Sequence, residues 1–229
     1  MRGADTITSM STDLARLLQL ASPALPVGAF SYSQGLEAAI EANIVHDRAS
    51  AEQWIADVLE LSVACMEAPI LVRLVAAWRA DDCAAAARWN EDFLASRESS
   101  ELRAETVQMG YSLRSLLGQL EGAATLDAMD EPSFPAAFAY ATVQWRIAPH
   151  DALVAYLWAW LENQVIAAVK SVPLGQTDGQ RILLSLGARL EAIAGDAESI
   201  EDAALGAYVP GLALLSSDHE TQYSRLFRS

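Results

Sequence analysis

Apolar residues recur at every third or fourth position through most of this chain of 229 residues, which is the spacing of one helix face. No segment alternates apolar and polar residues between hairpin turns, so we predict no β-strand. The predicted fold is all-α, a single-domain bundle of about eight to ten helices. In the first segment Leu14, Leu17 and Leu18 share one face, which we expect to be buried. The segments expected to be helical are 12–21, 33–43, 50–65, 69–78, 82–93, 100–118, 135–145, 149–169, 182–193 and 199–207, with a further helix from Pro210.

Capping residues and prolines predict where these helices begin. Ser50 and Gln53 have the spacing of a capping box, with the serine before the first turn and the glutamine reaching back to it. Pro69 is expected to begin a new helix, because proline fits the first turn of a helix but disrupts its interior. Residues 23–30 contain two prolines and a glycine and predict an ordered loop, and residues 121–134 predict a second loop.

The end of the chain has a character of its own. Ser217 and Glu220 form a second capping box, which predicts a helix in the tail. Such a helix would group the apolar and cationic side chains of the tail, namely Tyr223, Arg225, Leu226, Phe227 and Arg228. Aromatic residues and arginines are enriched in protein interfaces. We therefore divide the chain into a flexible lead over residues 1–11, an all-helical domain over 12–215 and a partner-docking tail over 216–229.

The most apolar run is ALVAYLWAWL, residues 152–161. A helix needs about twenty apolar residues to cross a bilayer, and Glu162, Asn163 and Gln164 interrupt this one. We therefore expect it to be the central buried helix of the bundle and not a membrane span.

Charge and cysteine content narrow the possible partners and the compartment. The formal net charge is −15, which disfavours binding to nucleic acid or anionic membranes and favours a basic partner protein or a cation. The N-terminal residues show no apolar core and no cleavage-site pattern, so we expect no signal peptide and a cytoplasmic location. Cys65 and Cys83 lack partners at metal-binding or redox spacing, and both are expected to be small buried residues.

The segment Lys170–Arg181, KSVPLGQTDGQR, follows the most apolar helix and combines two cations with a Pro-Leu-Gly turn and two glutamines. It lacks the G-x-x-x-x-G-K-[ST] spacing with which a phosphate loop holds a nucleotide, and no predicted strand precedes it. It also lacks the nucleophile or base usual in a catalytic loop. We expect a shaped polar loop that docks a partner or gates access.

Few side chains are arranged for metal binding or catalysis. The histidines His46, His150 and His219 lie far apart and lack the i+4 partner that would place two ligands on one helix face. We expect the first two at the surface and the third to be a contact residue in the tail. Ser31 and Ser33 lie near a predicted helix start without a G-x-S-x-G elbow, and capping accounts for them. We assign no metal ligand, no catalytic residue and no cofactor.

Three irregular segments together resemble one family. Residues 17–37 (LLQLASPALPVGAFSYSQGLE), 170–187 (KSVPLGQTDGQRILLSLG) and 216–229 (SSDHETQYSRLFRS) look like the corresponding segments of the urease accessory protein UreF family, in the same order and in a chain of similar size. One departure is Ala29, where that family usually has a second glycine. The change removes one flexible position and leaves the resemblance intact.

The resemblance implies an all-α protein without enzyme activity that forms a homodimer. It implies binding to the accessory protein UreD (UreH in some organisms), recruitment of the GTPase UreG, and delivery of nickel to apo-urease, with a role as a GTPase-activating factor or as a gate for metal fidelity. The implied partner-binding residues are Tyr32, Lys170, Pro173, Leu174, Gly175, Gln176, Gln180, Arg181, Tyr223, Arg225, Leu226, Phe227 and Arg228.

Two other readings remain open from the residues alone. One is a helical interaction module with no connection to urease. The other is a hydrolase in which folding brings Ser31 or Ser33 within hydrogen-bond reach of His46 or His150.

Overall fold

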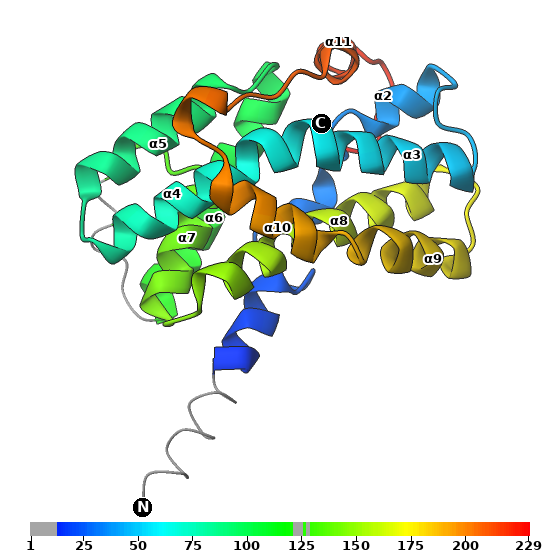
Figure 1. Cartoon of the computed structure of the whole chain (residues 1–229). Coiled ribbons are helices and arrows are strands. Elements are labelled where there is room, and N and C mark those ends of the chain that lie inside the picture. The colour runs from blue at the N-terminus through cyan, green and yellow to red at the C-terminus, as the bar shows by residue number, and fades with distance from the viewer. Residues whose placement is uncertain (1–12, 121–125, 127–128) are drawn as a thin grey trace, which may run out of the picture.

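A computed structural model describes residues 13–120, 126 and 129–229, and all regular secondary structure within these residues is helical (Figure 1). This confirms the predicted all-α fold. The predicted lead over 1–11, the candidate cap Thr12 and residues 121–125 and 127–128 of the predicted loop lie outside the described residues. The helices are α2 (Leu36–Glu41), α3 (Arg48–Val58), α4 (Ala68–Arg79), α5 (Cys83–Ala95), α6 (Ser100–Leu120), α7 (Phe134–Gln144), α8 (Pro149–Ser171), α9 (Gln176–Gly187), α10 (Leu190–Ser199) and α11 (Pro210–His219), with the short 3-10 turns η1 (Ala29–Ser31) and η4 (Asp202–Ala204) and a π-helical stretch η2 (Leu59–Glu67).

The core forms where α4, α7 and α8 meet. Helix α7 packs against both α4 and α6, and its alanines allow this close approach because they carry little side-chain volume. Helix α8 in turn contacts α2, α3, α4, α7, α9 and α10. The largest fully buried side chains come from several of these helices and include Leu36, Ile55, Ile70, Leu74, Phe93, Leu113 and Phe138.

Helix α8 is the central helix that the apolar run predicts. It is the one described helix long and apolar enough to cross a membrane, and 61% of its most apolar window is buried inside the fold. Helices on several sides cover it, so its apolar surface is used in the core.

One prediction about helix breaks is wrong, because α3, η2 and α4 form a single continuous helical rod across Pro69 (Figure 1). A proline lacks the N–H that would bond to the carbonyl four residues earlier, here that of Cys65. The backbone N–H of Gly206 donates to this carbonyl at 3.3 Å. The π-helical turn before Pro69 and this donor from a distant segment let the rod continue.

Capping at the start of this rod also differs from the prediction. Asp47 is the N-cap, its side chain accepts from the Ser50 N–H at 2.8 Å, and the Ser50 hydroxyl accepts from the Asp47 N–H at 3.0 Å. Ser50 is therefore the third helical residue and not the cap. The reciprocal arrangement is a capping box placed three residues earlier than the sequence pattern indicated.

The region after α8 is divided differently from the expectation. The predicted helix over 182–193 is two helices, α9 and α10, with Arg189 at their junction donating to Glu60 of η2 at 2.6 Å. Both helices pack on α8, and the break between them accommodates this. The expected helix over 199–207 is reduced to the single 3-10 turn η4.

Two expectations about burial are wrong. The helix over residues 13–21 extends away from the body (Figure 1). Leu14 and Leu18 are exposed, whereas Leu17 is partly buried against the core and Leu20 is buried in it. Cys83 is exposed at the first position of α5, and Cys65 is partly exposed.

Candidate functional site

The three sequence segments that carry the family resemblance meet at one place in the fold. The backbone N–H of Arg228 donates to the carbonyl of Ser31 at 2.8 Å, and that of Ser33 donates to the backbone oxygen of Ser229 at 2.7 Å. The Lys170 ammonium lies near both segments, close to the rings of Phe30 and Phe227. We call this junction of residues 28–37, the end of α8 and residues 220–229 the convergence site.

Lys170 stands at the centre of this site. It lies in the last turn of α8, where a positive charge is favoured by the negative end of the helix dipole. Its Nζ atom is 5.8 Å from the ring centroid of Phe30 and 5.9 Å from that of Phe227. Rings at these distances attract a cation through their negative faces. One ammonium therefore links the first and the last of the three segments.

Tyr32 connects the site to the interior. Gly28 has a positive φ of 82°, which lets the chain turn into η1, and Tyr32 follows in an extended conformation. Its carbonyl accepts from the Asn163 side chain of α8 at 3.3 Å. Burial raises the pKa of the Tyr32 hydroxyl, the charge of Glu105 adds to this, and a hydrogen bond with the Arg228 side chain opposes it.

The tail is not helical, so this prediction is wrong. Helix α11 ends at His219, and Glu220 accepts from the Ser100 N–H at 2.9 Å and from its hydroxyl at 2.6 Å. The predicted capping glutamate therefore caps the start of α6 instead of continuing its own chain as a helix. The following residues form turns and bends against the body.

A single carboxylate on α2 fixes the end of the tail. Glu37 accepts from the backbone N–H groups of Leu226 at 2.7 Å and Phe227 at 2.8 Å. The Phe227 side chain is buried, whereas Tyr223 and Leu226 are exposed. The tail thus buries one aromatic side chain and leaves two apolar side chains in solvent, and does not place all three on one side.

His219 lies between two carboxylates beneath the tail. It is fully buried, with Nδ1 2.7 Å from Glu101 and Nε2 3.3 Å from Glu37. The other oxygen of Glu101 accepts from Arg225 at 2.6 Å. This confirms the expectation that His219 is a contact residue.

The serines near the predicted helix start are structural. The Ser33 hydroxyl donates to the Ser229 backbone oxygen at 2.6 Å and accepts from the Glu37 N–H at 3.2 Å. Helix α2 begins after this turn, at Leu36. Within the described chain no hydrogen bond joins either serine to a histidine, and His150 lies between Glu191 and Glu198. The geometry therefore gives no support to the hydrolase reading.

A buried polar network below the tail was missed from the sequence. The Glu105 carboxylate accepts from Gln34 Nε2 at 2.7 Å and from the Ser229 hydroxyl at 2.8 Å. The oxygen of the Gln34 amide accepts from Trp160 Nε1 at 2.7 Å. Gln34 adopts a positive φ of 53°, which is unusual for a residue other than glycine and points to a position held by its surroundings.

Burial raises the pKa of Glu105 to about 7, the hydrogen bonds from Gln34 and Ser229 oppose this rise, and the charge of Glu67 adds to it. The sequence contained one signal for this residue. Glu105 lies three positions after Leu102 and four before Met109, on the apolar face of α6. A charged residue at a core position marks a site where the interior is polar.

The remaining predicted residues are divided between a short loop and a helix. Pro173, Leu174 and Gly175 form the loop, while Gln176, Gln180 and Arg181 lie on α9, so the expected long loop is wrong. Arg181 pairs with Asp178 at 2.9 Å. Among the described contacts none joins Gln176, Gln180 or Arg181 to the tail.

The glycine in this stretch has a packing role. A Cβ atom added at Gly179 would lie 2.8 Å from a Val169 methyl and 3.4 Å from one of Val165. The glycine therefore allows α9 to pack closely on α8, and Asp178 of the Asp-Gly pair lies in the first turn of α9.

Comparison with known proteins identifies the family. The family model for UreF matches residues 45–187, and a urease accessory protein UreF from Azoarcus sp. (strain BH72) is 59% identical over 223 residues, covering 94% of this chain and 95% of its own length. The chain belongs to the UreF family of urease accessory proteins. Other UreF proteins are similar over 94% of the chain: that of Dechloromonas aromatica (strain RCB) at 50% identity, which is covered over 97% of its length, and that of Janthinobacterium sp. (strain Marseille) at 53%, covered over 98%.

UreF membership confirms the resemblance drawn from the three segments and makes this chain an accessory protein of urease maturation. It does not fit the reading as a module unrelated to urease. In the part of the chain that the structure describes, no group of three or more His, Cys, Asp or Glu side chains is arranged to hold a metal ion. The convergence site itself presents rings, cations and backbone groups.

Proposed function

We propose that this chain is a cytoplasmic maturation scaffold that assembles, as a homodimer, with UreD (UreH), the GTPase UreG and apo-urease, and supports insertion of nickel into the urease active site. Membership of the UreF family supports the role in urease maturation. The assignment of partners rests on the sequence resemblance. The convergence site supplies the structural argument for where a partner binds.

The observation that supports partner binding at the convergence site is the set of exposed side chains along its rim. Phe30 is 59% exposed and Leu226 is 64% exposed, although each lies beside a residue of the packed interior. Tyr223 is fully exposed, and Lys170 and Arg228 are exposed cations. Aromatic, aliphatic and cationic side chains grouped in this way are typical of the anchors of protein interfaces.

The structure also changes how the tail should be tested. Removing residues 216–229 would delete the buried side chains of Phe227 and Ser229 and the buried His219. Loss of a partner in that deletion would therefore mix a binding defect with a folding defect. Substitutions at the exposed residues leave the buried contacts in place.

The test is co-purification of UreD with a Tyr223→Ala/Leu226→Ala double variant. Tyr208→Ala is the matched control, because Tyr208 is 86% exposed and lies outside the convergence site. We expect the double variant to lose most UreD while keeping its melting temperature, and the control to behave as the unmodified chain. Full retention of UreD by the folded double variant would refute the docking role of the tail.

Lys170→Gln tests the loop end of the same surface. We expect reduced urease activation in a co-expression assay with the full accessory set and nickel. The melting temperature should fall only slightly, since the ammonium is exposed and its contacts with the two rings are weak. Arg181→Gln is the companion variant on α9. Normal urease activation by both variants would show that this surface is not needed for nickel delivery.

A further inference from the structure

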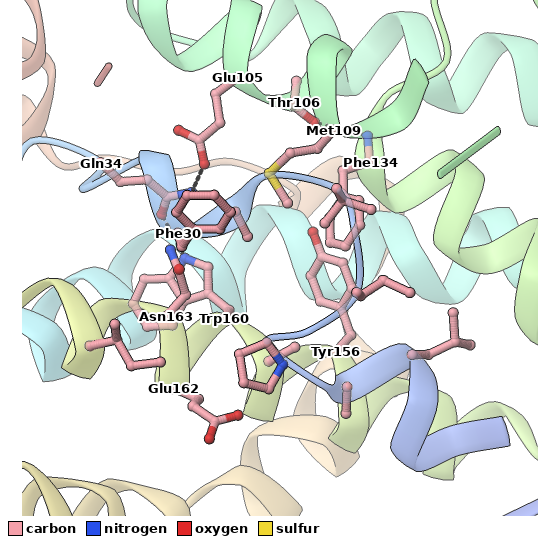
Figure 2. Close-up of a pocket in the computed structure, with 18 of the residues that line it drawn as sticks. Phe30, Gln34, Glu105, Thr106, Met109, Phe134, Tyr156, Trp160, Glu162 and Asn163 are labelled. Atoms are coloured by element: carbon pink, nitrogen blue, oxygen red, sulfur yellow. Dashed lines mark hydrogen bonds between the residues drawn. The ribbon is translucent and has the colours of Figure 1, made fainter. Parts of the chain in front are cut away.

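The end of the tail, residues 226–229, covers a carboxyl group that is buried on α6. Glu105 is 4% exposed, and its two oxygens accept from the Gln34 amide and from the Ser229 hydroxyl. Figure 2 shows the Glu105 side chain reaching from α6 to Gln34. Ser229 is itself buried, so the tail both bonds to this carboxyl group and covers it on that side.

The surroundings of Glu105 offer little compensation for a negative charge. Both of its donors are neutral, and the positive charge of Arg97 acts on it more weakly than the negative charge of Glu67. The other charged or titratable groups around it are Tyr32, Tyr156 on α8 and, through its hydrogen bond to Tyr32, Arg228 of the tail. The pocket beside it is lined mostly by apolar residues (Figure 2). Burying an ionised carboxyl group here is costly, so the neutral form is favoured while the tail is in place.

We propose that docking of the tail end depends on a proton at Glu105: residues 226–229 are held most firmly when this carboxyl group is neutral, and they are released more readily when it is ionised. The reason is that water can solvate the carboxylate once the tail end has moved away. This inference concerns the chain alone and stands whether or not UreD binds the tail. Release would free the Phe227 ring and the backbone groups of residues 31–33 for contact with another protein.

The pH range of this effect follows from proton binding. With the tail docked, burial raises the pKa of Glu105 from 4.5 to about 7, and the hydrogen bonds from Gln34 and Ser229 oppose this rise. Release admits water and brings the pKa back toward its ordinary value. The docked state therefore holds the proton more tightly, so docking weakens as pH rises toward 7 and levels off above about 8. The docking equilibrium should fall by up to about tenfold per pH unit, and by up to about twentyfold between pH 5.5 and 7.5.

Amide hydrogen exchange of the full chain, followed by NMR, measures this docking equilibrium. The backbone N–H of Arg228 donates to the carbonyl of Ser31, so its exchange with solvent requires the tail end to open. This bond joins two backbone groups that do not titrate. The protection factor, which is the ratio of the intrinsic to the observed exchange rate, removes the pH dependence of the exchange chemistry itself.

Glu105→Gln is the test variant, because glutamine keeps the shape of the carboxyl group without its titration. Glu162→Gln is the matched control. Burial also raises the pKa of Glu162, which lines the same pocket, but among the described contacts none joins its side chain to the tail. Glu37 and His219, which lie beneath the tail, are present in all three proteins, so their titration cancels in the comparison.

Between pH 5.5 and 7.5 we expect the protection factor of the Arg228 amide to fall about tenfold more in the unmodified chain and in Glu162→Gln than in Glu105→Gln. An equal fall in the unmodified chain and in folded Glu105→Gln would overturn the proposal. So would a protection factor that does not change with pH in the unmodified chain, because the proton would then act on global unfolding alone. If Glu105→Gln does not fold, 13C NMR of the Glu105 carboxyl in the unmodified chain decides: titration near 7 with pH-dependent protection supports the proposal, and titration near 4.5 overturns it.

Discussion

Replacing Glu105 with glutamine gives a direct measure of the buried network under the tail. The carboxyl accepts from Gln34 and Ser229, and glutamine has nearly the same shape but no charge. In the folded chain burial raises the pKa of Glu105 from its ordinary value of 4.5 to about 7. The substitution therefore removes the one titration that this network contributes between these two values.

The sign of the effect follows from proton binding. Between pH 4.5 and about 7 the folded chain holds the Glu105 proton more tightly than the unfolded chain, so this group makes the protein less stable as pH rises. Each pH unit is worth about 1.4 kcal/mol, so the loss across this interval is about 3 kcal/mol. Glu105→Gln should be close to the unmodified chain in stability near pH 4.5 and more stable by up to about 3 kcal/mol at pH 8.

The assay is urea unfolding at half-unit intervals from pH 4.5 to 8 in buffers free of carboxylic acids. The quantity of interest is the difference between the two proteins, because Glu162 and His150 also have raised pKa values, Glu162 through burial and His150 through hydrogen bonds with Glu191 and Glu198. Both proteins share those titrations, which cancel in the difference. A difference that stays constant with pH, or a variant that loses stability as pH rises, would refute the assignment of a raised pKa to Glu105.

Two further predictions use matched pairs. Phe227→Ala should lower the free energy of unfolding by about 3 kcal/mol, because the ring is buried. Tyr223→Ala should change it by less than about 0.5 kcal/mol, because that ring is fully exposed. Urea unfolding checks both variants, and equal effects would mean that the tail is not packed. Gly179→Ala should destabilise the folded protein by about 1–3 kcal/mol, because the added methyl would crowd Val169. Gly195→Ala on α10 has nothing near its added methyl and should stabilise the folded protein by about 0.5–1 kcal/mol. Thermal unfolding checks this pair, and stabilisation by both variants would contradict the close approach of α8 and α9.

The fold class and most helices were determined by local patterns. Asp82 at the start of α5 and the prolines at the starts of α7 and α8 act within a few residues, so the sequence predicts the helices that begin there. Pro69 failed as a boundary signal because its consequence depends on a remote group. The carbonyl that it frees is satisfied by Gly206, and no local pattern contains that contact.

The candidate site also combines features that local sequence predicts with features that depend on contacts between distant residues. The irregular segments at 17–37, 170–187 and 216–229 were sufficient to indicate the family, because each is a specific string of residues and not a periodic pattern. Their meeting around Lys170 was not predictable, since it depends on Glu37 holding the backbone of Leu226 and Phe227 from the far end of the chain.

The sequence by itself therefore determined the helical class, the central apolar helix and the family, since helix periodicity, capping and short specific segments act over neighbouring residues. The tertiary structure alone decided that the tail forms turns and bends and no helix, that Glu105 and Arg97 are buried beside one pocket, and that α9 replaces an expected loop. Those outcomes depend on contacts between distant residues, where burial raises the pKa of a carboxyl and leaves two guanidinium nitrogens without a hydrogen-bond partner among the described residues.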